Sequence, residues 1–425
     1  MLRGAATTFL LAATLEGALV TIDNLSPRFD ANGTIMNAHD GTIRWLNGEW
    51  WVHAASYGED GGGDLCDDPP LRGCDSAAAH GCGFHANHNV SMFSSPDLSS
   101  GSWVYRGDAL RCAEVPDCAI LYRPHLVWNP STRLYVLFYN YVSASGKPQR
   151  IGAATSASPG GPFTLRTANI SNARPVLPSN HHGSMGDFDV LVDPADGAGY
   201  IVYSYGPMSL EKLAPDFLSS AGINASFVGG GFGGTTVPTP FAEAPALWTR
   251  SVDGTTHYYL TLGHCCCFCW QGSGMIVYRA QHPLGPWVAQ SGGADLGCTP
   301  GASNPTPVDA RTLPLTAQPS PGQGCNYPSG TVAASVSRAQ QNFVFPVRTA
   351  DGGTAMVYTG DRWMQAPDGK KAHEPQFWTH LEFDSTTHDV LPLRWNDTLA
   401  IDLAVPQPQF PPTPASRARV PTLYW

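Results

Sequence analysis

The stretch HDGTIRWLNGEWWVHAAS, from His39 to Ser56, contains the pattern that decides the fold of this chain. It places a polar residue ahead of an apolar run, a turn at Asn47-Gly48 and then an aromatic run. Two short runs rich in β-branched and aromatic residues around an Asn-Gly turn predict a β-hairpin. The pattern returns four more times along the chain, beginning at Arg123, Asp187, Glu243 and, in a weaker copy, Gln340.

A second motif follows three of these copies and adds two more predicted strands to each. It reads SMFSSPDLSSGSWVY from Ser91, IGAATSASPGGPFTL from Ile151 and MIVYRAQHPLGPWVA from Met275. Four strands per unit are typical of a propeller blade, and repeated units of this kind bury their faces only by stacking on one another. The sequence therefore predicts an all-β, five-bladed propeller with four-stranded antiparallel blades, forming a single domain over residues 21–425.

Composition agrees with one large β domain and restricts its partners. The chain has 45 Gly and 37 Pro among 425 residues, which suits many turns and short strands. Its formal charge of -10 argues against nucleic acid or an anionic membrane as a partner. A neutral polysaccharide or oligosaccharide is a better match, and we expect a monomer with no membrane insertion.

The N-terminal residues predict export from the cell. Arg3 precedes an apolar stretch over residues 5–15, and the small residues Gly17 and Ala18 are typical of a cleavage region, which predicts a secretory signal peptide over 1–20. Six N-x-S/T sequons follow, at Asn24, Asn32, Asn89, Asn169, Asn224 and Asn396. Together they favour a secreted glycoprotein, either extracellular or at the cell surface.

Eleven cysteines fall into three groups, which predict Cys-rich loop insertions. The groups are Cys66, Cys74, Cys82, Cys112 and Cys118, in an insert at about residues 60–118; Cys265, Cys266, Cys267 and Cys269; and Cys298 and Cys325. One interpretation is a metal site, with His264 beside the second group. In an oxidising compartment, disulfides that hold long loops are favoured, and the odd count leaves one cysteine unpaired or intermolecular.

Polar residues stand at equivalent places ahead of the repeated strands. The innermost strands of a propeller line its central funnel, so Asp40, Asp187 and Glu243 are expected to converge there. Carboxylates that meet in a funnel shift one another's pKa values, which favours one as an acid and another as a base. The alternative is that each one is a turn residue bonded to backbone. Recurrence on several blades favours the functional interpretation.

At these residues the sequence resembles glycoside hydrolase family 43, the five-bladed propeller glycosidases. That family has a base Asp in a D-x-x-apolar motif, an Asp that tunes the acid, and an acid Glu in an EAP motif. Asp40-Gly41-Thr42-Ile43 matches the first motif, with Gly41 where the family usually has Pro; Asp187-Phe188-Asp189-Val190 matches the second, and Glu243-Ala244-Pro245 the third. The resemblance spans roughly residues 38–363, most of the chain.

The chain is most similar to the exo-β-1,3-galactanase branch of that family. The matching motifs are Ala38-His39-Asp40-Gly41-Thr42, Arg123-Pro124, Glu243-Ala244-Pro245-Ala246, Gln340 ahead of Val344-Phe345-Pro346-Val347, and Gly360-Asp361-Arg362-Trp363. Two departures matter. The branch lacks the base Asp and is thought to use the Gln, whereas this chain has both Asp40 and Gln340; and Tyr122 stands where the branch has a substrate-binding Glu.

The mechanism that this resemblance implies is inverting hydrolysis of a terminal glycoside. Glu243 would protonate the leaving oxygen, and Asp187 would orient Glu243 and raise its pKa through like charge. A base on the opposite face would activate water, which needs carboxyls about 6.5 to 9.5 Å apart. Asp40 is the first choice for this base and Gln340 the second.

Sugar binding calls for flat aromatic rings and paired donors. Trp270 and Arg362 are the main candidates, and the weaker ones are Arg123, His39, Glu59 and Tyr122. No cofactor is required. A structural Ca²⁺ occurs in some relatives, but no ligand set in this chain is specific enough to predict one. Three alternatives stay open: a carbohydrate-binding propeller without turnover, an arabinofuranosidase or xylosidase of the same family, and a disulfide-rich interaction propeller.

Overall fold

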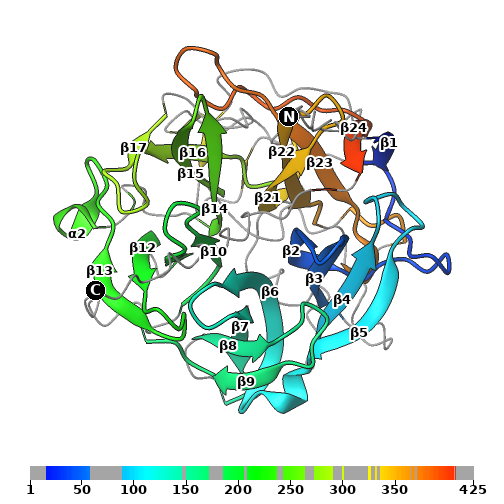
Figure 1. Ribbon diagram of the computed structural model, residues 1–425, viewed down its shortest axis with the longest axis horizontal. Coiled ribbons are helices and arrows are strands. Elements are labelled where there is room, and N and C mark those ends of the chain that lie inside the picture. Colours follow the sequence, from blue (N-terminus) through cyan, green and yellow to red (C-terminus); the bar gives the residue numbers. More distant parts are fainter. Residues whose placement is uncertain are drawn as a thin grey trace, which may run out of the picture.

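The computed structural model shows a ring of small sheets around a central axis (Figure 1). It describes residues 16–57, 89–145, 150–171, 185–204, 208–235, 237, 243–263, 272–290, 299–300, 324–326, 331–332, 336–363, 365–368, 371–405 and 407. The predicted all-β, five-bladed propeller is confirmed.

Four of the blades are four-stranded and antiparallel, and the first strand of each contains or directly follows the start of one of the repeats seen in the sequence. The first contains β2 (His39–Leu46), β3 (Glu49–Ser56), β4 (Asn89–Ser95) and β5 (Val104–Leu110). The second contains β6 (Cys118–Asn129), β7 (Leu134–Ser143), β8 (Arg150–Ser156) and β9 (Thr164–Thr167). The third contains β10 (Phe188–Val192), β11 (Gly199–Ser204), β12 (Met208–Leu213) and β13 (Ser220–Asn224). The fourth contains β14 (Glu243–Val252), β15 (Thr255–Gly263), β16 (Ile276–Ala280) and β17 (Val288–Ala289).

The fifth blade is completed by strands from both ends of the described chain. Its sheet contains β21 (Gln340–Arg348), β22 (Thr354–Asp361) and β23 (Gln376–Leu381). Beside it, β1 (Glu16–Asp23) pairs antiparallel with β24 (Thr398–Val405) (Figure 1). Asn24 ties this pair to β23, because its Nδ2 donates to the Trp378 carbonyl at 3.0 Å and its Oδ1 accepts from the Trp378 N–H at 2.8 Å.

The strand β1 overlaps the segment 1–20 that was predicted to be a signal peptide. β1 begins at Glu16, inside the segment 1–20, and Val20 and Ile22 are buried in the core. A cut after residue 20 would therefore divide the strand that closes the ring.

The remaining elements are short. They are β18 (Thr299–Pro300), β19 (Gly324–Asn326), β20 (Thr331–Val332), α2 (Gly231–Gly234) and the 3-10 turns Cys112–Glu114 and Lys371–His373. Among the described residues, no helix has the length and apolar character needed to cross a membrane.

Buried side chains fill the space between each pair of neighbouring blades. Between the fourth and fifth blades, for example, Trp248 stacks on Tyr259 with ring centroids 4.2 Å apart, in one cluster with Tyr358 and Phe377. Burying one large apolar side chain stabilises the fold by about 1.5–3 kcal/mol, and no blade could bury these faces alone. The expectation that the repeats stack is therefore confirmed, and stacking turns the starts of the inner strands toward one axis.

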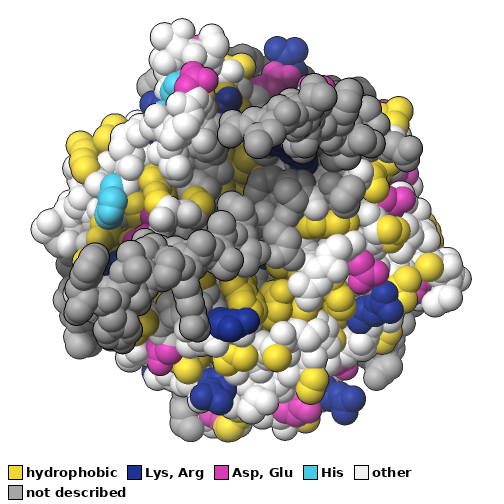
Figure 2. Space-filling view, viewed as in Figure 1, with side chains coloured by type: hydrophobic (Ala, Val, Ile, Leu, Met, Phe, Trp, Pro, Cys, Tyr) yellow, Lys and Arg dark blue, Asp and Glu magenta, His cyan; other side chains and the backbone are white. Residues whose placement is uncertain are grey.

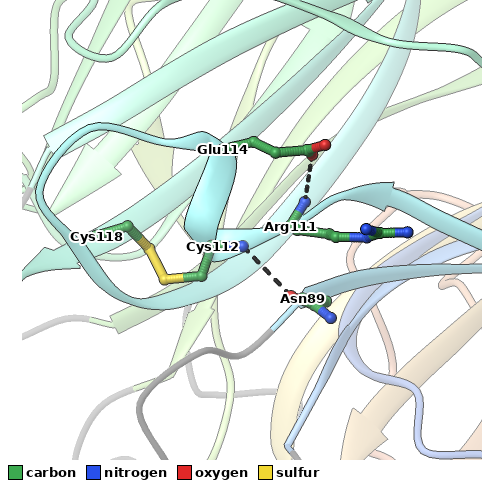
Figure 3. The surroundings of a disulfide bond; sticks show 5 residues. All are labelled: Asn89, Arg111, Cys112, Glu114 and Cys118. Carbon is green, nitrogen blue, oxygen red and sulfur yellow. Dashed lines mark hydrogen bonds between the residues drawn. A yellow bond between two sulfur atoms is a disulfide. The ribbon is translucent and has the colours of Figure 1, made fainter.

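The surface of the ring is mixed in charge. In the view of Figure 2, the acidic and basic side chains of the described residues are interspersed around the rim. Within the described residues, a disulfide joins Cys112 to Cys118, the first residue of β6, and Asn89 accepts from the Cys112 N–H at 3.3 Å (Figure 3). For this pair, the disulfide interpretation of the cysteines is confirmed. The cluster from Cys265 to Cys269 lies outside the described residues.

Candidate active site

The inner strands share a backbone irregularity at the end where the polar residues lie. Register shifts occur in β2 between His39 and Thr42, in β6 between Tyr122 and His125, and in β14 between Glu243 and Ala246. Inside these bulges, three residues other than glycine have a positive φ: Asp40 at 55°, Arg123 at 51° and Ala244 at 49°. A bulge adds a residue to one strand and re-aims its side chains, so the same device on three blades directs polar groups into the funnel.

The bulge in β2 also explains one departure from the family motif. A Cβ on Gly41 would lie 2.2 Å from the His53 carbonyl oxygen and 2.7 Å from Ala54. Because β2 passes this close to β3, only glycine fits at this position, and the proline usual in the family would collide with the backbone of β3.

Asp40 is buried at the centre of the cluster and uses only one of its carboxylate oxygens. Its Oδ2 accepts a hydrogen bond from the Tyr57 hydroxyl, and its backbone N–H donates to Asp361 Oδ2 at 2.8 Å. Within the described part of the chain, its Oδ1 has no hydrogen-bond partner; the Arg123 Nε lies 3.9 Å away. Asp40 therefore keeps one buried oxygen that is paired with the Arg123 cation but accepts no hydrogen bond among the described residues.

Arg123 lies between two of the predicted carboxylates. Its side chain is buried, and its Nε lies 3.2 Å from Asp187 Oδ1 as well as 3.9 Å from Asp40 Oδ1. Its Nη1 donates to the Gln341 carbonyl at 3.0 Å. Burial alone would lower the pKa of the Arg123 guanidinium, but Asp187 and Asp40 outweigh this and raise it, so the group stays a cation.

The acid candidate is attached to this cluster through two neighbours. Asp187 Oδ2 accepts from the Ala244 N–H at 2.9 Å, which fixes the backbone next to Glu243. Gln340 Nε2 donates to Glu243 Oε2 at 3.4 Å, and Trp363 Nε1 donates to Gln340 Oε1 at 2.9 Å. The four predicted catalytic residues are thus brought together, with Glu243 half-buried at the cluster.

Burial and like charge make Asp40 an unusually weak acid for an aspartate. Burial raises its pKa, the negative charges of Asp361 and Asp187 raise it further, and Arg123 and the Tyr57 hydrogen bond lower it, with a result of about 6. A carboxylate with this pKa can take up a proton near neutral pH and is ionised above it. Asp40 is therefore suited to act as a general base.

Asp361 serves a different purpose from Asp40, because both of its oxygens are occupied. Burial would raise its pKa, but hydrogen bonds from His39, from the Asp40 N–H and from Asn342 lower it overall. Asn342 Nδ2 and Gln376 Nε2 each donate to it at 2.7 Å. Asp361 is a fixed anion that holds the bulge around Asp40 in place.

The predicted sugar-binding residues are placed unequally. Arg362 lies away from the carboxylates: its Nη1 donates to the Asn24 carbonyl at 2.6 Å, its Nη2 donates to Gln365 Oε1 at 2.7 Å, and its guanidinium lies over the Trp395 ring. These contacts join the fifth blade to the end of β1. The structure gives Arg362 a packing role rather than a place in the carboxylate cluster.

The other sugar-binding candidates either touch the cluster or lie outside the described chain. His39 contacts Asp361 at 3.4 Å and stacks on the Tyr57 ring, and Arg123 binds the carboxylates as described above. Tyr122 is half-buried and packs against the cluster of Ala55, Tyr57 and Trp363. Trp270 and Glu59 fall outside the described residues.

Sequence reasoning missed Tyr57, Asp361 and Trp363 as members of the cluster. Asp361 and Trp363 stand on either side of Arg362 in a motif that the sequence had already marked. In extended backbone, successive side chains alternate between two faces, so Asp361 points to the side opposite Arg362. That alternation was the available signal for Asp361; Tyr57 follows the end of β3 and carries no comparable signal.

The arrangement contains the parts needed for acid–base hydrolysis. It has a half-buried carboxyl at Glu243, a second carboxylate at Asp40 with one oxygen that accepts no hydrogen bond within the described residues, and a buried cation at Arg123 between Asp40 and Asp187. In the described part of the chain, no group of three or more His, Cys, Asp or Glu side chains could hold a metal ion.

Comparison with solved structures tests the fold. At a TM-score of 0.63 and 22% identity, 90% of this chain matches 67% of an exo-β-1,3-galactanase from Clostridium thermocellum. A GH43 β-1,3-galactosidase solved with galactodeoxynojirimycin gives 0.59 at 18% identity, with 88% of this chain on 99% of that one. The chain has the fold of the family 43 glycoside hydrolases. The resemblance predicted from its motifs is confirmed at this level.

A third structure with the family 43 fold, an exo-β-1,3-galactanase from Phanerochaete chrysosporium, was solved with β-1,3-galactotriose. It gives a TM-score of 0.58 at 17% identity and covers 89% of this chain and 68% of its own. No protein-family model and no curated protein matches the sequence.

Proposed function

We propose that this protein is an exo-acting, inverting glycoside hydrolase that removes terminal sugars from a β-1,3-galactan-like polysaccharide. The proposal depends on the contacts that bring three predicted residues to Glu243. Arg123 lies between Asp40 and Asp187, and Asp187 accepts from the Ala244 N–H beside Glu243. Gln340 donates to Glu243 directly. The galactan substrate is favoured by the β-1,3-galactanases and β-1,3-galactosidase named above, which share the fold.

In the proposed reaction, water attacks the anomeric carbon from the face opposite the leaving group. Glu243 donates its proton to the glycosidic oxygen as the bond to the anomeric carbon breaks, and Asp40 Oδ1 takes one proton from the attacking water. Asp187 holds the backbone beside Glu243 and balances Arg123. One bond forms, one breaks, and the product has the inverted configuration.

The direct test is NMR of the first products formed from β-1,3-galactan and, in parallel, from arabinan. We expect galactose or short galacto-oligosaccharides to be released with inversion, and Glu243→Gln to lower kcat by about 10²–10⁴-fold because the proton donor is lost. A retained configuration, or full activity in Glu243→Gln, would contradict the mechanism. Release from arabinan alone would move the substrate to arabinosides, and binding without product would make the protein a carbohydrate-binding propeller.

We also propose that the protein is secreted and glycosylated, at a subset of its sequons. Asn32, Asn169 and Asn396 are exposed, whereas Asn24 is fully buried and its Nδ2 donates to two carbonyl groups. Glycopeptide mass spectrometry of protein secreted by a eukaryotic host should therefore find glycans at the three exposed sites and none at Asn24. A glycan on Asn24 would contradict this placement.

A further inference from the structure

A small cluster of buried side chains contacts the two candidate bases, Asp40 and Gln340. It consists of Ala55, Tyr57 and Trp363, all buried, with the Tyr57 and Trp363 ring centroids 5.8 Å apart. Tyr57 follows β3 of the first blade and Trp363 follows β22 of the fifth, so the cluster joins the two blades on which Asp40 and Gln340 lie.

Each ring of the cluster donates one hydrogen bond to one candidate base. The Tyr57 hydroxyl donates to Asp40 Oδ2, and Trp363 Nε1 donates to Gln340 Oε1 at 2.9 Å. The consequences differ. Asp40 keeps Oδ1 without a hydrogen bond among the described residues, whereas both ends of the Gln340 amide are bonded: its oxygen accepts from Trp363 and its NH₂ donates to Glu243. A neutral amide is also a much weaker base than a carboxylate.

From this geometry we propose that Tyr57 is a positioning residue for hydrolysis: its hydroxyl holds one oxygen of Asp40 so that the other, Oδ1, accepts the proton of the attacking water. This inference rests on the proposed function. The same cluster fixes the orientation of the Gln340 amide, because Trp363 donates to its oxygen while its NH₂ donates to Glu243. This arrangement favours Asp40 over Gln340 as the base.

Other charged groups surround the hydrogen bond between Tyr57 and Asp40, and the test variant changes none of them. Arg123, Asp361 and Asp187 act on Asp40 directly. His39 stacks on the Tyr57 ring with centroids 4.9 Å apart, and Lys371 Nζ lies 4.9 Å from the Tyr57 ring centroid and 3.6 Å from that of Trp363. Glu374 pairs with Lys371 at 3.5 Å. A substitution that removes only the Tyr57 hydroxyl leaves all of these groups in place.

The experiment compares Tyr57→Phe with Tyr258→Phe in the full-length protein. Tyr258 is a matched control, because its hydroxyl also donates to a buried aspartate, Asp193, between the third and fourth blades. We expect Tyr57→Phe to lower kcat on β-1,3-galactan by about 10- to 100-fold with KM changed by less than about twofold, since the base is misplaced while sugar contacts remain. Its acidic limb in kcat/KM should move to higher pH, because a hydrogen bond that favours the carboxylate is lost. Tyr258→Phe should change neither.

A second measurement separates this inference from the proposed function. The carboxyl of Asp40 is titrated by ¹³C NMR of aspartate-labelled protein and assigned with Asp40→Asn. We expect its midpoint to rise in Tyr57→Phe and to stay constant in Tyr258→Phe, whether or not the parent hydrolyses galactan. If the parent is inactive and the Asp40 midpoint still rises in Tyr57→Phe, the proposed hydrolase activity is overturned. The inference that Tyr57 lowers the pKa of Asp40 is then kept.

A purely structural role for Tyr57 predicts a different result. Tyr57→Phe would then lower Tm while leaving kcat, the acidic limb and the Asp40 midpoint unchanged, and the proposal would be overturned. Trp363→Phe is the second variant, because it removes the donor to Gln340 and keeps an aromatic ring. It should lower kcat by about tenfold through Glu243 without moving the acidic limb, and a moved limb would overturn the assignment of Gln340.

Discussion

Asp40 on the first blade and Asp187 on the third lie on either side of the same arginine, but their surroundings differ. The Asp40 side chain is 7% exposed, and only its Oδ2 is hydrogen-bonded among the described residues. The Asp187 side chain is 15% exposed, and its two oxygens face Arg123 and the Ala244 N–H. Equivalent positions on different blades thus supply different chemistry: one carboxylate is left with an oxygen to accept a proton, and the other is committed to the backbone that carries Glu243.

The largest expected difference between the two carboxylates is in turnover. Asp40→Asn should lower kcat by about 10²–10⁴-fold, because an amide is a far weaker base than a carboxylate. Asp187→Asn should lower it by only about 10- to 100-fold, because the Glu243 backbone loses part of its support while the base remains. Initial rates on β-1,3-galactan check both variants. A larger loss in Asp187→Asn would reverse the roles assigned here.

Arg123→Met tests what the two carboxylates share. Removing a buried cation leaves two carboxylates without their counter-ion, so we expect the free energy of unfolding to fall by about 3–5 kcal/mol at pH 7. The loss should be smaller at pH 4, where Asp40 is protonated. Urea unfolding at the two pH values measures it.

Arg106→Met is the control for this variant. Arg106 pairs with Glu49 on the surface at 3.4 Å, with both side chains about 40% exposed. Its loss should cost less than about 1 kcal/mol at either pH. Equal losses in Arg106→Met and Arg123→Met would mean that the central ion pairs do not hold the cluster together.

The repeats in the sequence predict the inner strands well, because their signal is local. The hairpin expected over residues 39–56 is β2 and β3, and the polar residues at the starts of four inner strands converge as expected from propeller geometry. Closure of the ring depends instead on residues 16–23 pairing with residues 398–405. No local pattern records a pairing over that separation, so the three-stranded fifth sheet was not foreseen.

The site residues also divide into those with a local signal in the sequence and those brought to the site only by tertiary packing. Asp40, Asp187 and Glu243 were predicted because each stands at the start of a recognisable strand, and Gln340 was predicted from the family resemblance. Arg362 was predicted where Asp361 was not. Asp361 at the end of β22 pairs with Gln340 at the start of the inner strand β21, while Arg362 donates to the Asn24 carbonyl. Tyr57 meets Asp40 only through tertiary packing.

The next difference between the two carboxylates is in stability. Asp40 has a pKa of about 6 in the folded protein against an ordinary value of 3.8, so its contribution to stability is present at low pH and is lost as pH rises through 6. Asp40→Asn cannot ionise, and we expect it to be more stable than the parent by about 2–3 kcal/mol at pH 7 and by little at pH 4. Asp187→Asn should be less stable than the parent at pH 7, because it loses a charged acceptor for Arg123. Chemical denaturation at both pH values would contradict this if Asp40→Asn were the less stable variant at pH 7.

The smallest expected effect shows how far the two carboxylates sense each other. The negative charge of Asp187 is one of the causes that raise the pKa of Asp40, and Asp187 also competes with it for Arg123. Asp187→Asn should therefore move the acidic limb of kcat/KM, expected near pH 6 in the parent, to lower pH by about half a unit. Asp108→Asn, which removes a carboxylate on the outer strand β5, should leave the limb where it is. A limb that moves to higher pH in Asp187→Asn would mean that Asp40 is not the group titrating, because removing a neighbouring negative charge can only make an aspartate easier to ionise.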